Sequence, residues 1–189
     1  MRMIQTKILL IFVIAIITAN SSYAQKTENE VWSEPVNGIQ GRLLIRKGVE
    51  VNGTKMVHVY LELRNILDVA TPIEVYFDPV RSIRSQMVDA AGKSVAQYPS
   101  PADIESPLPF FLALPFDSML RFRISVSGYG VPRAAGTNIQ LMGGNWLIRL
   151  DDKGEYFLEG TFVSQPTNPR PGQRVWQGTL KLPKVTIPH

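Results

Sequence analysis

Few side chains in this sequence could carry acid–base, nucleophilic or metal chemistry. The 189 residues include no Cys and only two His, His58 and the final residue His189. Thiol nucleophiles, Cys-ligated zinc, iron–sulfur clusters and disulfides are therefore excluded, and one internal imidazole supplies neither a His-rich metal site nor a His-based triad. Because Glu62 is the one carboxylate close to it on the same strand face, we interpret His58 as a surface histidine.

Hydroxyl and carboxyl chemistry has equally little support. The segment Ser125–Gly130 lacks the first glycine of the Gly-x-Ser-x-Gly motif that presents a serine nucleophile. Asp103 and Glu105 offer the two carboxyl groups of a glycoside hydrolase, but acidic residues in such a loop are usually solvated. The Asp151–Glu155 turn lacks the spacing of a calcium loop. We predict a non-catalytic protein with no catalytic residue, no metal ligand and no cofactor.

The candidate binding residues lie on two predicted strands. In the segment 56–65, the side chains of His58, Tyr60, Glu62 and Arg64 alternate with apolar ones, and Tyr76 has the same polar parity in 73–77. If the two strands pair, these five side chains share one outward face. Exposed Tyr and Arg are typical of protein interfaces, and tyrosine rings also stack on sugars. The alternative is that the two rings form a cross-strand pair, which stabilises a sheet by ~0.2–1 kcal/mol without any ligand.

The first 24 residues predict export. A positively charged start at 1–7 precedes the apolar run 8–17, and Ser22-x-Ala24 suits a signal peptidase, with cleavage before Gln25. The apolar run is too short for a membrane span of ~20 residues. We therefore expect a periplasmic, cell-surface or extracellular protein with no transmembrane span after cleavage.

Charge does not identify a partner. Loss of Arg2 and Lys7 with the signal peptide leaves 18 basic residues against 16 acidic ones, so the net charge falls from +4 to about +2. The Lys and Arg residues are scattered singly along the sequence. Because nucleic-acid binding needs a basic stripe or patch, we predict no nucleic-acid partner.

The elements that carry these residues are strands. From Ile39 onward the hydrophobic pattern has a period of two, and no segment shows a sustained helical stripe. This predicts an all-β fold, an antiparallel two-sheet sandwich, with an open barrel as the alternative. The expected strands are 39–47, 56–65, 73–77, 83–89, 93–97, 118–127, 138–142, 145–150, 155–163 and 175–182.

The domain organisation is simple. A loose lead-in over 25–37 follows the signal peptide at 1–24, and a single domain covers 38–189. Within the domain, residues 98–116 are rich in proline and are predicted to form a long loop, because proline cannot donate to a sheet ladder. A loop of this length is uncommon in a compact domain unless it is functional or mobile.

One motif resembles a known family. The segment Asp152-Lys-Gly154-Glu-Tyr156-Phe-Leu158 is similar to the Asp-x-Gly-x-Tyr-x-Cys motif of strand F in immunoglobulin domains, with Leu158 in place of the Cys. The resemblance implies an immunoglobulin-like sandwich of the bacterial type without a disulfide, in which the Tyr156 hydroxyl bonds back to nearby backbone. The candidate strand C has no Trp, and the motif brings no catalytic residue.

These observations favour an exported, non-catalytic β-sandwich that binds another protein or a component of the cell envelope. A carbohydrate-binding module is the alternative, and it predicts a planar strip of exposed aromatic rings with Tyr60 and Tyr76 as candidates. Some bacterial immunoglobulin-like domains inhibit proteases, so the family resemblance also allows an inhibitor that uses the loop 98–116. A small hydrolase is the remaining alternative.

Overall fold

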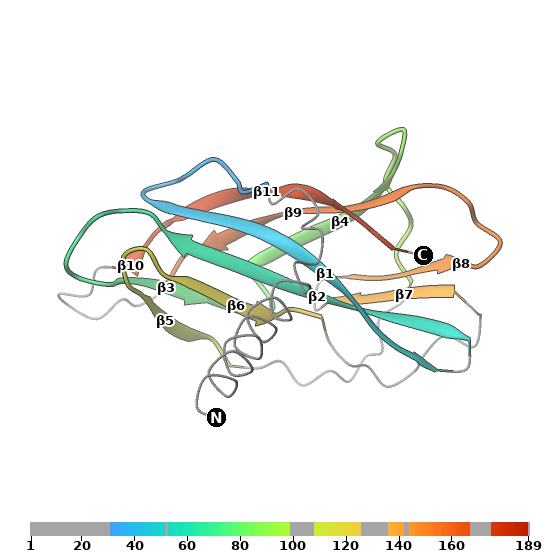
Figure 1. Cartoon of the computed structure of the whole chain (residues 1–189), viewed down its shortest axis with the longest axis horizontal. Helices are drawn as coiled ribbons and strands as arrows, with labels where there is room; N and C mark the ends of the chain where they lie inside the picture. Colours follow the sequence, from blue (N-terminus) through green and yellow to red (C-terminus); the bar gives the residue numbers. More distant parts are fainter. Residues whose placement is uncertain are drawn as a thin grey trace, which may run out of the picture. The chain divides into compact units, whose positions relative to one another are not determined.

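The computed structural model describes residues 31–51, 53–98, 108–125, 136–141, 144–166 and 175–188 (Figure 1). The chain divides into two units, Met1–Val31 and Trp32–His189, and the description below concerns the second. The predicted signal peptide, residues 25–30 of the lead-in and residues 99–107 of the Pro-rich loop lie outside the described residues.

The described residues form strands and no helix, as the period-two pattern predicts. No helix in the described part of the chain could span a membrane. The strands are β1 (Ile39–Val51), β2 (Thr54–Asn65), β3 (Ile73–Phe77), β4 (Ile83–Asp89), β5 (Phe110–Leu114), β6 (Met119–Arg123), β7 (Gly136–Leu141), β8 (Gly144–Arg149), β9 (Tyr156–Ser164), β10 (Val175–Trp176) and β11 (Gly178–Thr186).

The strands are arranged in three sheets. The first has five strands in the order β1-β2-β7-β8, with β6 also paired to β2; the second has the order β10-β3-β5 and the third β11-β9-β4. The prediction of a wholly antiparallel arrangement is wrong at two places, because β7 pairs parallel to β2 and β10 pairs parallel to β3. Side-chain alternation specifies which face of a strand is buried, but it does not specify the direction of the neighbouring strand.

The inward side chains of all three sheets meet in one core. On β2 these are Val57, Val59, Leu61 and Leu63, each at most 4% exposed, as the alternation predicts. A Cβ added to Gly41 of β1 would lie 2.9 Å from Leu182 Cδ2 of β11, so the first and third sheets approach closely at this glycine. In Figure 1, β4, β9 and β11 run above β2, β6 and β7.

Aromatic rings join the second and third sheets. Phe162 of β9 is fully buried and stacks on Trp176 of β10 with ring centroids 5.9 Å apart. It also lies 6.3 Å from the ring of Phe77 on β3. Trp176 is 4% exposed, which confirms its predicted place in the core.

Part of the predicted loop 98–116 is a strand. Its residues Phe110–Leu114 form β5, which pairs antiparallel with β3. A turn through Pro115–Ser118 then leads directly into β6, which pairs with β2 in the first sheet. The short segment β5–β6 therefore belongs to two sheets.

Candidate functional site

The outward face of β1, β2 and β6 gathers five arginines. In the β1–β2 register, Arg42 lies opposite Glu62 and Arg46 opposite His58. In the β2–β6 register, Arg121 lies opposite Glu62 and Arg123 opposite Tyr60, while Arg64 lies two residues beyond Glu62 on β2. We call this surface the arginine face; its arginines are Arg42, Arg46, Arg64, Arg121 and Arg123.

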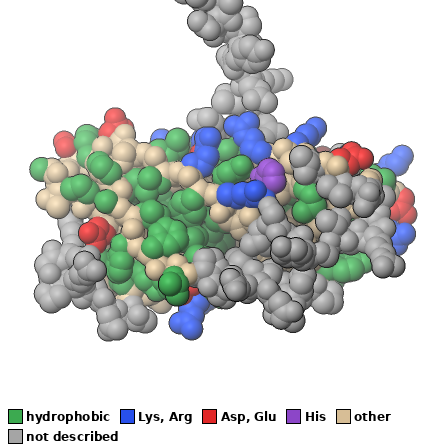
Figure 2. Space-filling view, turned by 90° about the horizontal axis from the view of Figure 1, so that it is seen from below, with side chains coloured by type: hydrophobic (Ala, Val, Ile, Leu, Met, Phe, Trp, Pro, Cys, Tyr) green, Lys and Arg blue, Asp and Glu red, His purple; other side chains and the backbone are tan. Residues whose placement is uncertain are grey.

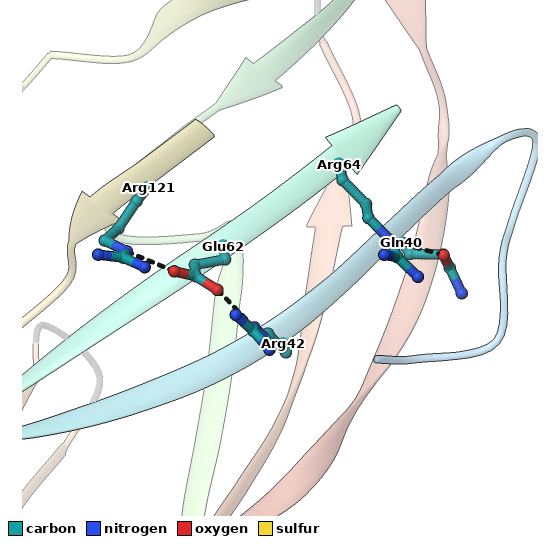
Figure 3. Close-up of polar contacts among 5 residues, drawn as sticks. All are labelled: Gln40, Arg42, Glu62, Arg64 and Arg121. Carbon is teal, nitrogen blue, oxygen red and sulfur yellow. Dashed lines mark hydrogen bonds and ion pairs between the residues drawn. The ribbon is translucent and has the colours of Figure 1, made fainter. Parts of the chain in front are cut away.

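Glu62 lies at the centre of the arginine face and is fully buried. Arg42 Nε donates to Glu62 Oε2 and Arg121 Nε donates to Glu62 Oε1, so one carboxylate holds two guanidinium groups (Figure 3). The Arg42 side chain is only 10% exposed, whereas that of Arg121 is 44% exposed. Because two positive charges meet one negative charge, these three side chains together keep a net positive charge.

The ring of Trp32 packs against two arginines of the same surface. The guanidinium carbons of Arg42 and Arg64 lie over its ring, 4.4 and 4.3 Å from the centroid, within the range of a cation–π interaction. Arg64 Nε also donates to Gln40 Oε1 at 2.8 Å, as Figure 3 shows. Trp32, which lies in the segment predicted as a lead-in, therefore packs against arginines of the sheet.

The charge of the arginine face is nearly constant around neutral pH. Burial lowers the pKa of His58, and the nearby charge of Arg123 lowers it further, so the imidazole is neutral. Five arginines and one glutamate then give the face a charge of +4, which exceeds the net charge near +2 that remains when residues 1–24 are removed. The rest of that chain therefore carries about −2, and its charge distribution is strongly asymmetric.

Four of the five predicted binding residues lie together on this face: His58, Tyr60, Glu62 and Arg64. Tyr76 does not, because β2 and β3 belong to different sheets and do not pair with each other. The shared outward face that such pairing would give Tyr60 and Tyr76 is therefore not formed. The Tyr76 ring instead lies 5.3 Å from that of Phe111 and lines an open cleft of about 410 Å³ with Asp78 and Arg81.

The sequence reasoning missed Trp32 and four of the arginines as site residues. Their signal is present in the sequence, since Arg42 and Arg46 alternate on one strand and Arg121 and Arg123 on another. Each pair looks like ordinary strand-surface polarity by itself. Only the pairing of β1 and β6 on either side of β2 brings the two pairs together with Arg64.

A second polar arrangement surrounds Tyr156. Its hydroxyl donates to Asp152 Oδ2, while Asp152 Oδ1 accepts from the backbone N–H of Gly154 at 2.9 Å. The structure thus gives this hydroxyl a carboxylate partner, and its bond to nearby backbone stays a prediction. Leu158, in the position of the immunoglobulin Cys, is fully buried in the core.

This contact predicts a step in alkaline titration. The hydrogen bond to Asp152 raises the pKa of Tyr156 to about 12, with burial and the charges of Asp152 and Asp89 as further causes. Because the folded pKa exceeds the ordinary value near 10, the stabilisation is complete below pH ~10 and is lost as the pH rises toward 12. Phenolate absorbance of the wild type minus that of Tyr156→Phe should show this late step.

Asp152→Asn is the control for that titration. Removing the carboxylate should bring the pKa of Tyr156 down toward its ordinary value. In proteins that keep Asp152, the melting temperatures of the wild type and Tyr156→Phe should converge between pH 10 and about 12, because the stabilisation is lost there. An unchanged late step in Asp152→Asn would contradict the assignment to this hydrogen bond.

Neither the arrangement of potential metal ligands among the described residues nor comparison with known proteins identifies a function. Among the described residues, no group of three or more His, Cys, Asp or Glu side chains is placed to hold a metal ion. No protein-family model matches the chain, and no curated protein or solved structure shows significant similarity to it.

Proposed function

We propose that this chain is an exported, non-catalytic β-sandwich of immunoglobulin-like type that binds an acidic component of the cell envelope through the arginine face. The observation that carries the proposal is the gathering of five arginines around one buried glutamate on a single sheet surface. Guanidinium groups bind carboxylate, sulfate and phosphate groups with well-defined geometry, and an acidic partner complements a charge of +4.

The geometry of the arginines supports binding more than a structural role. Arg42 and Arg121 share the carboxylate of Glu62. Arg64 and Arg123 instead donate from Nε to the uncharged oxygens of Gln40 and Ser125. Arg46, Arg121 and Arg123 are exposed residues, so a partner can reach them. Trp32 and Tyr60 add aromatic surface beside these cations, the combination that is enriched in binding interfaces.

The immunoglobulin-like type and the export are parts of the same proposal. The burial of Leu158 and the close approach of β1 to β11 support the first. The three-part N-terminal signal supports the second. Mass spectrometry of the chain recovered from its producing cells tests the export, because cleavage before Gln25 removes a defined mass.

Binding to defined anionic probes tests the site. The probes are a sulfated polysaccharide, polyglutamate and vesicles that contain phosphatidylglycerol. The variant Arg121→Gln/Arg123→Gln removes two charges from the arginine face and should weaken binding to at least one probe by about 10-fold or more. The matched control Lys93→Gln/Lys153→Gln removes two charges from exposed turns elsewhere and should change binding less than about threefold. Equal losses in the two variants, or no binding to any probe, would reject the proposal.

A further inference from the structure

We infer that the acidic component is the surface of a lipid membrane containing anionic lipids, on which the arginine face docks together with a neighbouring set of exposed apolar side chains. This inference rests on the proposed function, which leaves the chemical class of the envelope component open. It adds an apolar contact that a purely electrostatic partner would not need.

A run of exposed apolar side chains follows β5 and the turn into β6. Single exposed apolar residues are ordinary, whereas several together mark a contact surface. We call this set the apolar ridge; it comprises Leu108 (83% exposed), Phe110 (40%), Phe111 (40%), Phe116 (47%) and Met119 (48%).

The apolar ridge and the arginine face share strand β6. Met119 lies opposite Arg64 in the β2–β6 register, and two residues further along β6 Arg121 lies opposite Glu62. Figure 2 shows one face of the molecule on which hydrophobic side chains lie next to Lys and Arg side chains around a histidine. At Met119 the apolar ridge therefore adjoins the arginine face directly.

The turn that carries Phe116 is fixed to the end of β2. The fully buried Asn65 donates from Nδ2 to Leu114 O at 3.0 Å, and its backbone O accepts from the N–H of Asp117 at 3.0 Å. Its backbone N–H also donates to Ser118 O at 3.1 Å. The ridge is thus held in place relative to the arginines, as docking on a planar surface requires.

The ring contacts of β5 hold the other ridge residues. The Phe110 ring lies 5.3 Å from that of Phe77, which belongs to the core, and Phe111 lies 5.3 Å from Tyr76. The two phenylalanines are therefore packed at one side and open to solvent at the other. Aromatic side chains in this state are favoured at the boundary between lipid headgroups and acyl chains.

Membrane chemistry accounts for both surfaces, whereas a polyanionic polysaccharide accounts for the arginine face alone. Lipid phosphates accept hydrogen bonds from guanidinium groups, and each arginine near an anionic leaflet contributes about 1 kcal/mol. The acyl boundary takes up exposed Phe, Leu and Met side chains. A polyanionic polysaccharide offers no apolar phase for them, so it leaves the ridge unexplained.

Co-sedimentation with two kinds of vesicle tests the inference, using phosphatidylcholine alone and phosphatidylcholine mixed with phosphatidylglycerol. The chain is used as purified from the producing cells, with its N-terminus determined by mass spectrometry, because residues 8–17 are apolar and would bind vesicles by themselves. The quantity compared is the binding to the vesicles with phosphatidylglycerol minus the binding to the vesicles of phosphatidylcholine alone. The wild type should show a clear excess that falls as the salt concentration rises.

Two pairs of variants separate the two surfaces. Arg121→Gln/Arg123→Gln should lower the excess binding about 30-fold, the equivalent of about 1 kcal/mol per charge. Phe111→Ser/Phe116→Ser should lower it about 10-fold or more, since two apolar side chains no longer enter the interface. The matched controls are Lys93→Gln/Lys153→Gln for charge and Leu150→Ser, which is 58% exposed elsewhere in the fold, for apolar area.

Each outcome has a distinct meaning. Vesicle binding that depends on both surfaces and is insensitive to both controls supports the inference. Binding to polyglutamate or the sulfated polysaccharide without binding to the anionic vesicles overturns it and leaves the proposed function standing. Vesicle binding that survives Phe111→Ser/Phe116→Ser also overturns docking through the ridge. Absence of binding to every probe rejects both proposals, provided that circular dichroism shows a folded chain.

Discussion

Replacing Glu62 with Gln should lower the free energy of unfolding by about 3–5 kcal/mol, the range for breaking a buried ion pair by removing one partner. The carboxylate is fully buried and contacts the guanidinium groups of both Arg42 and Arg121. Without its charge, the buried guanidinium of Arg42 loses its anionic partner and, with that of Arg121, faces a neutral amide. Urea unfolding followed by circular dichroism measures the loss.

Glu159→Gln is the matched control for this prediction. Glu159 also has a basic partner, but its side chain is 24% exposed and that of Lys184 is 54% exposed, so the loss should be at most about 1 kcal/mol. The double variant Arg42→Met/Glu62→Leu should be more stable than Glu62→Gln, because it removes a buried cation together with its anion. Equal losses for Glu62→Gln and Glu159→Gln would contradict the central role given to Glu62.

Replacing Phe162 with Ala should cost about 3–5 kcal/mol, because the side chain is fully buried and its loss leaves a cavity. The ring stacks on Trp176 and lies beside Phe77, so the cavity would open between the second and third sheets. Leu at this position fills part of the volume and should cost less. Differential scanning calorimetry gives the stability of each variant.

Phe111→Ala serves as the comparison. Phe111 is 40% exposed and packs on one side against Tyr76, so its removal should cost about 1 kcal/mol or less. A loss for Phe111→Ala as large as that for Phe162→Ala would show that the core described around Phe162 is not the main support of the fold.

The strands could be predicted from the sequence because alternation is local. The pattern in 56–65 correctly assigns two sets of alternating side chains to opposite faces of β2. The inward set is Val57, Val59, Leu61 and Leu63, and the outward set is His58, Tyr60, Glu62 and Arg64. Trp176 and Leu158 were likewise predictable as core residues, since each has the apolar parity of its strand or motif. These successes depend only on neighbours within one strand.

The pairing of strands could not be predicted in the same way. No local pattern states that β2 lies between β1 on one side and β6 and β7 on the other, or that β3 joins β5 in another sheet. Register and sheet membership depend on contacts between segments far apart in the chain. For this reason the arginine face was missed as a cluster, and Tyr76 was grouped with residues of a different sheet.

The arrangement around Glu62 has a consequence for the entropy of binding. A free arginine side chain loses about 1.5–2 kcal/mol of rotamer entropy when it is immobilised. Glu62, Trp32 and Gln40 already hold Arg42, Arg64 and Arg121 in the unbound chain, so much of that entropy is lost during folding. A ligand therefore meets guanidinium groups that are already ordered. The negative charge of Glu62 lowers the positive charge available to an anionic ligand by one, but it also reduces the entropy that the arginine side chains lose on binding.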